Sequence, residues 1–111
     1  MDLTTKHCLP CQGTDSPLTE AEAKRFLNTT PGWELQQGAH HICRTFSFSN
    51  FANALAFVNQ VAELSERENH HPEIVFGWGY ATITFFTHKI NGLHENDFVM
   101  AAKINYLESL S

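Results

Sequence analysis

The chain has 111 residues, 42% of them hydrophobic and nine of them Phe, with a formal net charge of -5 at pH 7. This length supports one domain with a real core, and the composition excludes a disordered chain. Only seven basic residues are present, and they are scattered, which does not fit a nucleic-acid-binding surface. No apolar run approaches the ~20 residues of a membrane span, and the first residues lack the apolar segment of a signal peptide. We therefore expect a cytoplasmic protein with neither nucleic acid nor membrane as a partner.

The chain begins with a polar lead-in and a short helix. Residues 1–16 are rich in polar and turn-forming side chains, so we expect a flexible lead-in that carries a Cys-x-x-Cys pair. The remaining residues, 17–111, then form a single domain. Thr19, followed three residues later by Glu22, has the pattern of a capping box at the start of the first helix.

A hairpin and a long amphipathic helix come next. Pro31 and Gly32 interrupt the chain, and residues 33–48 contain two strand-like runs around a central glycine, which indicates a hairpin. After Ser49, a candidate cap, apolar side chains recur at spacings of three and four, which predicts an amphipathic helix. Pro72 disfavours helical geometry in the residue before it, so this helix should end at or before two adjacent histidines.

The second half of the chain predicts another hairpin and a last helix. Residues 73–88 contain two strands with a glycine-rich turn between them, and apolar residues alternate along the second strand. A helix should run from about Asn96 or Asp97 through Leu110, with Asp97 interpreted most simply as its cap. The order α-β-β-α-β-β-α predicts an α+β fold of two layers, with helices on one face of a four-stranded antiparallel sheet. The other face is left for solvent, ligand or partner chains.

The three cysteines indicate either a zinc site or a reduced pair of thiols. Their odd number does not suit the disulfide framework of a secreted protein. Cys8 and Cys11 have the spacing of zinc ligands, with His7 beside them, but a structural zinc site needs four ligands and no second Cys-x-x-Cys pair exists. A reduced and mobile pair is the alternative. The residues that remain as further ligands are Cys43, His40 and His41.

Three histidines form the most informative pattern in the sequence. His70 and His71 lie at the predicted end of the central helix, and His88 lies at the end of a predicted strand. Binding residues concentrate in loops of this kind, so the three imidazoles can share one cavity. Because histidine titrates near pH ~6.5, such a group supplies a proton donor and a proton acceptor at neutral pH. Glu66, four residues before His70, is a candidate to orient an imidazole.

The same histidines allow two other interpretations. Histidines at the end of a helix and of a strand can simply be surface residues, because a sequence does not show the geometry of a site. Together with Glu66 they also have the ligand chemistry of zinc, although no His-Glu-x-x-His motif is present and adjacent side chains tend to diverge.

The spacing of these residues resembles the signature of the pterin-4a-carbinolamine dehydratases. The similarity covers nearly the whole chain, including the Pro31-Gly32-Trp33 turn and the cysteine pair of the lead-in, which some bacterial members carry. A match at fixed gaps is far more specific than a cluster of histidines alone. The positions that carry the signature are Glu66, His70, His71, Pro72, Trp78, His88 and Asp97.

The resemblance implies a fold, a reaction and a state of assembly. The family has the layered fold expected above and forms homodimers that extend the sheet, often paired into homotetramers. Its members are hydro-lyases that remove water from 4a-hydroxytetrahydropterin and return quinonoid dihydropterin. This reaction recycles the pterin cofactor of aromatic amino-acid hydroxylases, as in phenylalanine catabolism. The resemblance implies no metal or organic cofactor.

The resemblance also assigns roles to residues of this chain. His70, His71 and His88 would be the catalytic imidazoles, and Glu66 would orient and tune one of them. Asn69 stands where vertebrate members have Asp, which replaces an acidic hydrogen-bond partner of the pterin by a neutral one. The implied substrate contacts are Asn69, His70, His71, Phe86, Thr87, His88 and Lys89.

Two other functions fit the same resemblance. Vertebrate relatives also act as dimerisation cofactors of a homeodomain transcription factor, so a binding or regulatory module is one alternative. A role in molybdopterin-cofactor metabolism is another. Acceleration of carbinolamine decay by the purified protein, or a phenylalanine hydroxylase encoded beside this gene, would favour the enzyme.

Overall fold

The computed structural model describes residues 2–10 and 12–110. Its helices and strands follow the order predicted from the sequence, and two short 3-10 turns, η1 and η2, are added to it. The elements are η1 (Leu3–Thr5), α1 (Glu20–Leu27), β1 (Glu34–Gln36), β2 (His41–Ser47), α2 (Phe51–Glu68), β3 (Glu73–Gly77), β4 (Tyr80–Phe85), η2 (His88–Ile90) and α3 (Glu95–Ser109).

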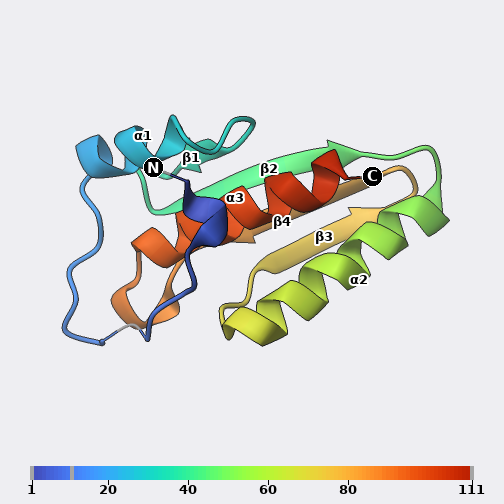
Figure 1. Cartoon of the computed structure of the whole chain (residues 1–111). Coiled ribbons are helices and arrows are strands. Elements are labelled where there is room, and N and C mark those ends of the chain that lie inside the picture. Colours follow the sequence, from blue (N-terminus) through green and yellow to red (C-terminus); the bar gives the residue numbers. More distant parts are fainter. Residues whose placement is uncertain (1, 11, 111) are drawn as a thin grey trace.

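The four strands form one antiparallel sheet in the order β1-β2-β4-β3. The helices lie on one face of this sheet, which confirms the predicted two-layer α+β fold (Figure 1). The alternation along β4 produces this arrangement, because Ala81, Ile83 and Phe85 are buried while the residues between them are partly exposed on the other face. The sheet therefore keeps one face that no helix of the described chain covers.

The helix caps agree with the sequence analysis at α1 and differ at α2 and α3. Thr19 and Glu22 form the predicted capping box. The cap of α2 is Asn50, whose side chain accepts the N–H of Asn53 at 2.8 Å, so the prediction of Ser49 was wrong by one residue. The cap of α3 is His94, and the helix starts one residue earlier than the earliest predicted start.

Helix α2 ends at Glu68, before the histidine pair, as Pro72 predicts. Asn69 caps it in the left-handed conformation, with φ of 52°, and the N–H of His70 reaches back to the carbonyl of Ser65 at 3.1 Å. Asparagine is one of the few side-chain-bearing residues that adopt this conformation readily. The turn takes the two histidines off the helix axis.

The core lies between the sheet and helices α2 and α3. Its largest fully buried side chains include Phe85, Phe98 and Ile42, and Trp33 packs at its edge with 3% of its surface exposed. Trp78, in the turn between β3 and β4, is by contrast 72% exposed. Within the described residues, no helix combines the length and the apolar character that crossing a membrane requires.

Candidate active site

A pocket of about 450 Å³ lies where the turn after α2 meets the chain that follows β4. The turn contributes residues 68–72, and the chain after β4, including the start of η2, contributes residues 86–89. The lead-in contributes residues 8–10, and Asn96 comes from the first turn of α3. Four separate segments of the chain therefore build one cavity.

The pocket brings together most of the residues that the sequence analysis selected. All three histidines line it, and so do the residues expected to contact a substrate. Glu66 does not line the pocket but reaches it through a hydrogen bond to one of the histidines. The selected residues that line it are Asn69, His70, His71, Phe86, Thr87, His88 and Lys89.

His70 is the most firmly held of the three histidines. Its Nε2 donates to the Oδ1 atom of Asp97 at 2.7 Å, and the two side chains are 12% and 0% exposed. Its ring stacks on Phe85, with centroids 5.8 Å apart and planes 7° from parallel. Because Nε2 carries the proton given to the carboxylate, Nδ1 is the nitrogen that can exchange a proton with a ligand.

Asp97 joins three segments that meet at the pocket. Besides His70, it accepts the hydroxyl of Thr87 at 2.9 Å and the backbone N–H of His94 at 3.0 Å. Its bond to His94 completes the capping box of α3, in which Asp97 is the third residue of the helix. The prediction that Asp97 is the cap was therefore wrong. The hydroxyl of Thr87 is turned toward this buried carboxylate, which leaves the rest of the residue to form the pocket wall.

Glu66 pairs with His71 and not with His70. Its carboxylate accepts a short hydrogen bond from Nε2 of His71, and the side chains are 77% and 54% exposed. Glu66 lies four residues before His70, a spacing that brings the two side chains together only within a helix, and α2 ends at Glu68. The left-handed turn at Asn69 then brings the next histidine, and not the first, back over Glu66.

His88 belongs to a 3-10 turn and not to a strand. Strand β4 ends at Phe85, and His88 is the first residue of η2, where its ring lies 4.1 Å from that of Phe86. The ring of Phe86 also contacts His40, with ring centroids 4.9 Å apart. Nε2 of His40 donates to Oδ1 of Asn91 at 3.0 Å. The prediction of a strand end was therefore wrong, although the position of His88 at the pocket is confirmed.

His40 and His41 form a second pair of histidines, and both rings lie near that of Phe86, which lines the pocket. Their Nδ1 atoms are 3.0 Å apart, so one of the rings must donate and the other accept. Burial lowers the pKa of His41, and its neighbour His40 lowers it further. From the sequence these two residues were candidates only for zinc ligands, because nothing in their spacing connects them to a pocket built from distant segments of the chain.

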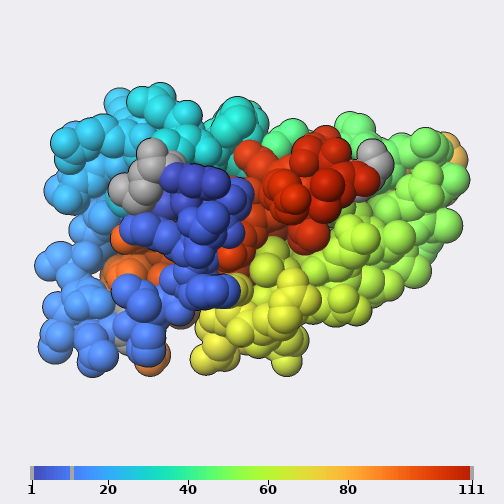
Figure 2. Space-filling model, viewed as in Figure 1, coloured from blue at the N-terminus to red at the C-terminus, as the bar shows by residue number. Residues whose placement is uncertain are grey.

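The lead-in is the largest part of the site that the sequence analysis missed. Cys8, Leu9 and Pro10 line the pocket, and in Figure 2 the dark-blue lead-in lies between the yellow end of α2 and the orange loop after β4. Burial raises the pKa of Cys8 to about 12, with Glu68 and Asp97 adding to the effect, so its thiol stays protonated at neutral pH. The flexibility of the lead-in and the division of the chain after residue 16 remain predictions.

The described residues contain no group of three or more His, Cys, Asp or Glu side chains arranged to hold a metal ion. His70, His71 and His88 together with Glu66 are therefore not arranged as such a group. The other proposed zinc site depended on Cys11, which lies outside the described residues.

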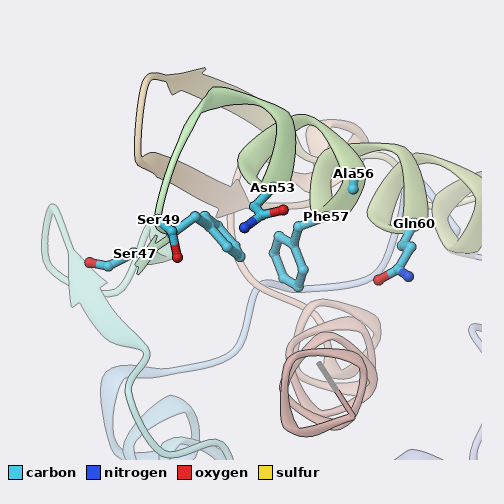
Figure 3. Close-up of a pocket in the computed structure, with 7 residues that line it drawn as sticks. Ser47, Ser49, Asn53, Ala56, Phe57 and Gln60 are labelled. Atoms are coloured by element: carbon cyan, nitrogen blue, oxygen red, sulfur yellow. The ribbon is translucent and has the colours of Figure 1, made fainter.

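A second hollow of about 610 Å³ lies between the start of α2 and the chain that enters it (Figure 3). Its walls include Ser47 and Ser49 on one side and Asn53, Phe57 and Gln60 on the helix. Hydroxyl, amide and apolar groups line it, and none of the lining residues titrates near neutral pH. Although it is larger, this hollow lacks the acid and base groups that the histidine pocket contains.

Residues 16–107 match the family model described as pterin 4 alpha carbinolamine dehydratase. The chain is 56% identical over 105 residues to a protein of Methylococcus capsulatus, which covers 95% of this chain and 92% of the relative. It is 54% identical over 106 residues to a protein of Rubrobacter xylanophilus, with 96% and 98% covered. Both relatives carry the name pterin-4-alpha-carbinolamine dehydratase as a provisional assignment.

Two solved structures have the same fold. A transcriptional coactivator/pterin dehydratase from Brucella melitensis is 36% identical, with a TM-score of 0.78, and the match covers 83% of this chain and 98% of that one. A pterin dehydratase-like protein identified as a RuBisCO assembly factor in the alpha-carboxysome is 29% identical, with a TM-score of 0.60 and coverage of 71% and 92%. With this agreement in sequence and fold, the chain belongs to the pterin 4 alpha carbinolamine dehydratase family.

Proposed function

We propose that the protein dehydrates 4a-hydroxytetrahydropterin to quinonoid dihydropterin by histidine general acid–base catalysis. The observation that carries this proposal is the pocket in which His70, His71 and His88 come together from two separate segments. In this role the protein recycles the pterin cofactor of an aromatic amino-acid hydroxylase, as in phenylalanine catabolism.

The reaction needs one proton donor and one proton acceptor. The bond between C4a and the hydroxyl oxygen breaks, and an imidazolium gives its proton to that oxygen, so the group leaves as water. A neutral imidazole takes the proton from the ring nitrogen as its electron pair forms the new C=N bond. The two transfers leave the protein with the same number of protons, and each is worth about 10²–10⁴-fold in rate.

His70 is the group best prepared for one of these transfers. Asp97 holds its Nε2, so Nδ1 is kept in one direction while the ring rests on Phe85. A positioned imidazole loses little freedom when the substrate binds, which is the basis of preorganised catalysis. His71 and His88 are more exposed, and they supply the second transfer and the contacts to the ring.

The remaining lining residues form the binding surface. Asn69 lines the pocket from the left-handed turn, and Phe86 and Lys89 add an aromatic ring and a charged side chain to the lining. Thr87 contributes its backbone and methyl group, because its hydroxyl is bound to Asp97. A flat heterocycle with hydrogen-bonding edges suits a cavity of this mixed character.

The direct test is the decay of the 4a-carbinolamine, followed by absorbance with and without the purified protein. We expect a protein-dependent acceleration that survives EDTA, because imidazoles perform the proton transfers. An unchanged decay rate would refute the proposal, and an activity lost in chelator and restored by zinc would refute the acid–base mechanism.

We also propose that the protein is a homodimer or homotetramer. Strand β3 lies at an edge of the sheet, with Val75 61% exposed, and Trp78 and Tyr80 add exposed aromatic surface beside it. Unpaired strand edges and large exposed apolar residues favour association with another chain. Light scattering that finds only a 12.6 kDa particle at micromolar concentration would contradict this.

A binding or regulatory role is the second candidate. The names of the two solved structures mention a transcriptional coactivator and a RuBisCO assembly factor, so relatives of this fold are associated with such roles. If carbinolamine decay is unaffected by the protein while the protein still forms a stable complex with a partner from the same cell, this second function replaces the first.

A further inference from the structure

The lead-in crosses the surface between the end of α2 and the loop after β4. In Figure 1 it descends from η1 and passes between these two parts of the molecule. Its residues 2–10 lie outside residues 16–107, which match the family model. The segment nevertheless forms part of the pocket wall through Cys8, Leu9 and Pro10.

Glu68 is the first anchor of the lead-in. Its Oε1 accepts the backbone N–H of Cys8 at 2.7 Å, and its Oε2 accepts Nδ1–H of His7 at 2.8 Å. The Glu68 side chain is only 8% exposed and lines the pocket. Hydrogen bonds to a carboxylate are stronger than those between neutral groups, so this anchor fixes two successive residues.

Asn96 is the second anchor. Its Oδ1 accepts the N–H of Leu9 at 3.0 Å, and its Nδ2 donates to the carbonyl of Leu9 at 2.6 Å. Asn96 is itself 4% exposed. Because the Asn96 side chain binds both the N–H and the carbonyl of Leu9, these two hydrogen bonds fix the backbone position of the lead-in at this residue.

The beginning of the lead-in is held as well. Leu3 is buried with 3% exposure, and Nζ of Lys103 donates to the carbonyl of Thr4 at 2.9 Å. Lys6 forms an ion pair with Glu95 at 2.6 Å. The segment from η1 to Pro10 therefore has supports along its length, and the two at the pocket are Glu68 and Asn96.

We propose that Cys8, Leu9 and Pro10 form a substrate-contacting wall that sets the affinity for the reduced pterin, with Glu68 and Asn96 as the residues that position it. This inference rests on the proposed dehydratase function. The wall lies beside the reacting groups, because its three residues line the same pocket as His70, His71 and His88.

The chemistry of the wall suits binding and not proton transfer. It presents an aliphatic side chain, a proline ring and a thiol that is protonated at neutral pH. None of these groups exchanges protons near pH 7, but together they offer apolar surface to one side of a flat heterocycle. Loss of the wall should therefore raise KM and leave kcat nearly unchanged.

The first test releases the wall without touching it. In Glu68→Ala/Asn96→Ala both pocket anchors are removed, while Leu3 and Lys103 still hold the start of the chain. We expect KM to rise by about 3- to 10-fold with kcat within about two-fold, which corresponds to about 0.6–1.4 kcal/mol of uniform binding. The single variant Glu68→Gln keeps an acceptor for the N–H of Cys8 and retains Asn96. Its KM should therefore lie much closer to that of the original protein than the KM of the double variant does.

The matched control is Glu63→Ala/Asn59→Ala. It removes the same two kinds of side chain from exposed positions of α2, away from the pocket. A melting curve of each variant accompanies the kinetics, so that a loss of folded protein is not read as a change in KM. Equal KM values for the anchor variant and this control would overturn the proposal.

The second test asks whether a bound pterin covers Cys8. In a Cys11→Ser/Cys43→Ser background, labelling of Cys8 by N-ethylmaleimide at about pH 9, where more of this thiol is ionised, is followed by mass spectrometry with and without 7,8-dihydrobiopterin, which has no 4a-hydroxyl to lose. We expect the pterin to slow labelling several-fold, and release of the anchors to speed it.

The two tests separate the possible failures. An active enzyme whose Cys8 is labelled equally fast with and without the pterin would overturn the wall and leave the dehydratase proposal in place. A protein without activity and without protection by the pterin would overturn both. Protection of Cys8 together with a selective rise of KM in the anchor variant would establish the wall.

Discussion

Two histidines of the pocket, His70 and His71, each pair with a carboxylate, and the two pairs differ in burial and in separation along the chain. His70 and Asp97 come from positions 27 residues apart, and their side chains are 12% and 0% exposed. His71 and Glu66 are only five residues apart, and their side chains are 54% and 77% exposed. The same two chemical groups are therefore present once inside the protein and once at its surface.

The difference shows which pair the fold can use to fix a reacting group. An exposed ion pair is worth about 0–1 kcal/mol and lets both side chains move, because water competes for each of them. Removing one partner of a buried pair costs several kcal/mol, because the other is left without water or a partner. The buried carboxylate is also fixed by Thr87 and by the backbone of His94, so His70 has one orientation.

The largest effect should come from the buried histidine. His70→Gln keeps an N–H that can reach Asp97 but removes the group that exchanges a proton. We expect kcat for carbinolamine dehydration to fall by about 10²-fold or more, the usual contribution of one proton-transfer group. The matched variant, His71→Gln, should lose clearly less.

Equal losses in the two variants would break the comparison, because burial would then not distinguish the histidines. The double variant sharpens it further. Groups that act as a unit are not additive, so the double variant should lose less than the product of the two single losses.

The next effect should come from Asp97→Asn. The amide would present an NH₂ group where the carboxylate accepts from His70, Thr87 and the N–H of His94, so at least one buried donor would lose its acceptor. We expect a loss of about 1–3 kcal/mol in the free energy of unfolding, measured by denaturant titration, and about a ten-fold loss in kcat. Unchanged stability would mean that this carboxylate is not the fixed point of the site.

A smaller effect is expected from Glu66→Gln. The amide still accepts a hydrogen bond from His71, and the exposed carboxylate contributes little energy, so the free energy of unfolding should change by less than about 0.5 kcal/mol. The value of kcat should stay within about three-fold of the original. A loss as large as that of Asp97→Asn would assign the tuning role to the surface pair, as the sequence resemblance implied.

The architecture could be predicted from local patterns because local interactions decide it. Alternating burial along β4, the capping box of Thr19 and the effect of Pro72 on the end of α2 all act over a few residues. The position of His70 and His71 followed from the predicted end of α2, and His88 reaches the same pocket although it lies in η2 and not at the end of a strand.

The partners inside the site could not be predicted in the same way. The bond between His70 and Asp97 depends on how the turn after α2 meets the start of α3, and no spacing rule connects positions 27 residues apart. The hydrogen bond between Leu9 and Asn96 joins positions 87 residues apart, and no spacing rule predicts it either. For Glu66 the sequence indicated that the carboxylate orients an imidazole but not which one, because the left-handed residue Asn69 decides which histidine returns to the helix.

The smallest effect should be a dependence of stability on pH through Glu68. Burial acts to raise the pKa of this carboxyl, but the N–H of Cys8, His7 and Lys103 outweigh it, so the pKa is lowered from its ordinary value of 4.5. A lowered pKa in the folded protein means that the stabilisation is fully present above pH 4.5 and is lost as the pH falls through the folded value. The difference in the free energy of unfolding between the original protein and Glu68→Gln should thus be larger at about pH 5.5 than at about pH 3.5. Glu63→Gln, on the exposed side of the same helix, should show no such trend. A Glu68→Gln difference that stays constant down to pH 3.5 would show that the charge of Glu68 does not hold the lead-in, and would reduce this anchor to its neutral hydrogen bond.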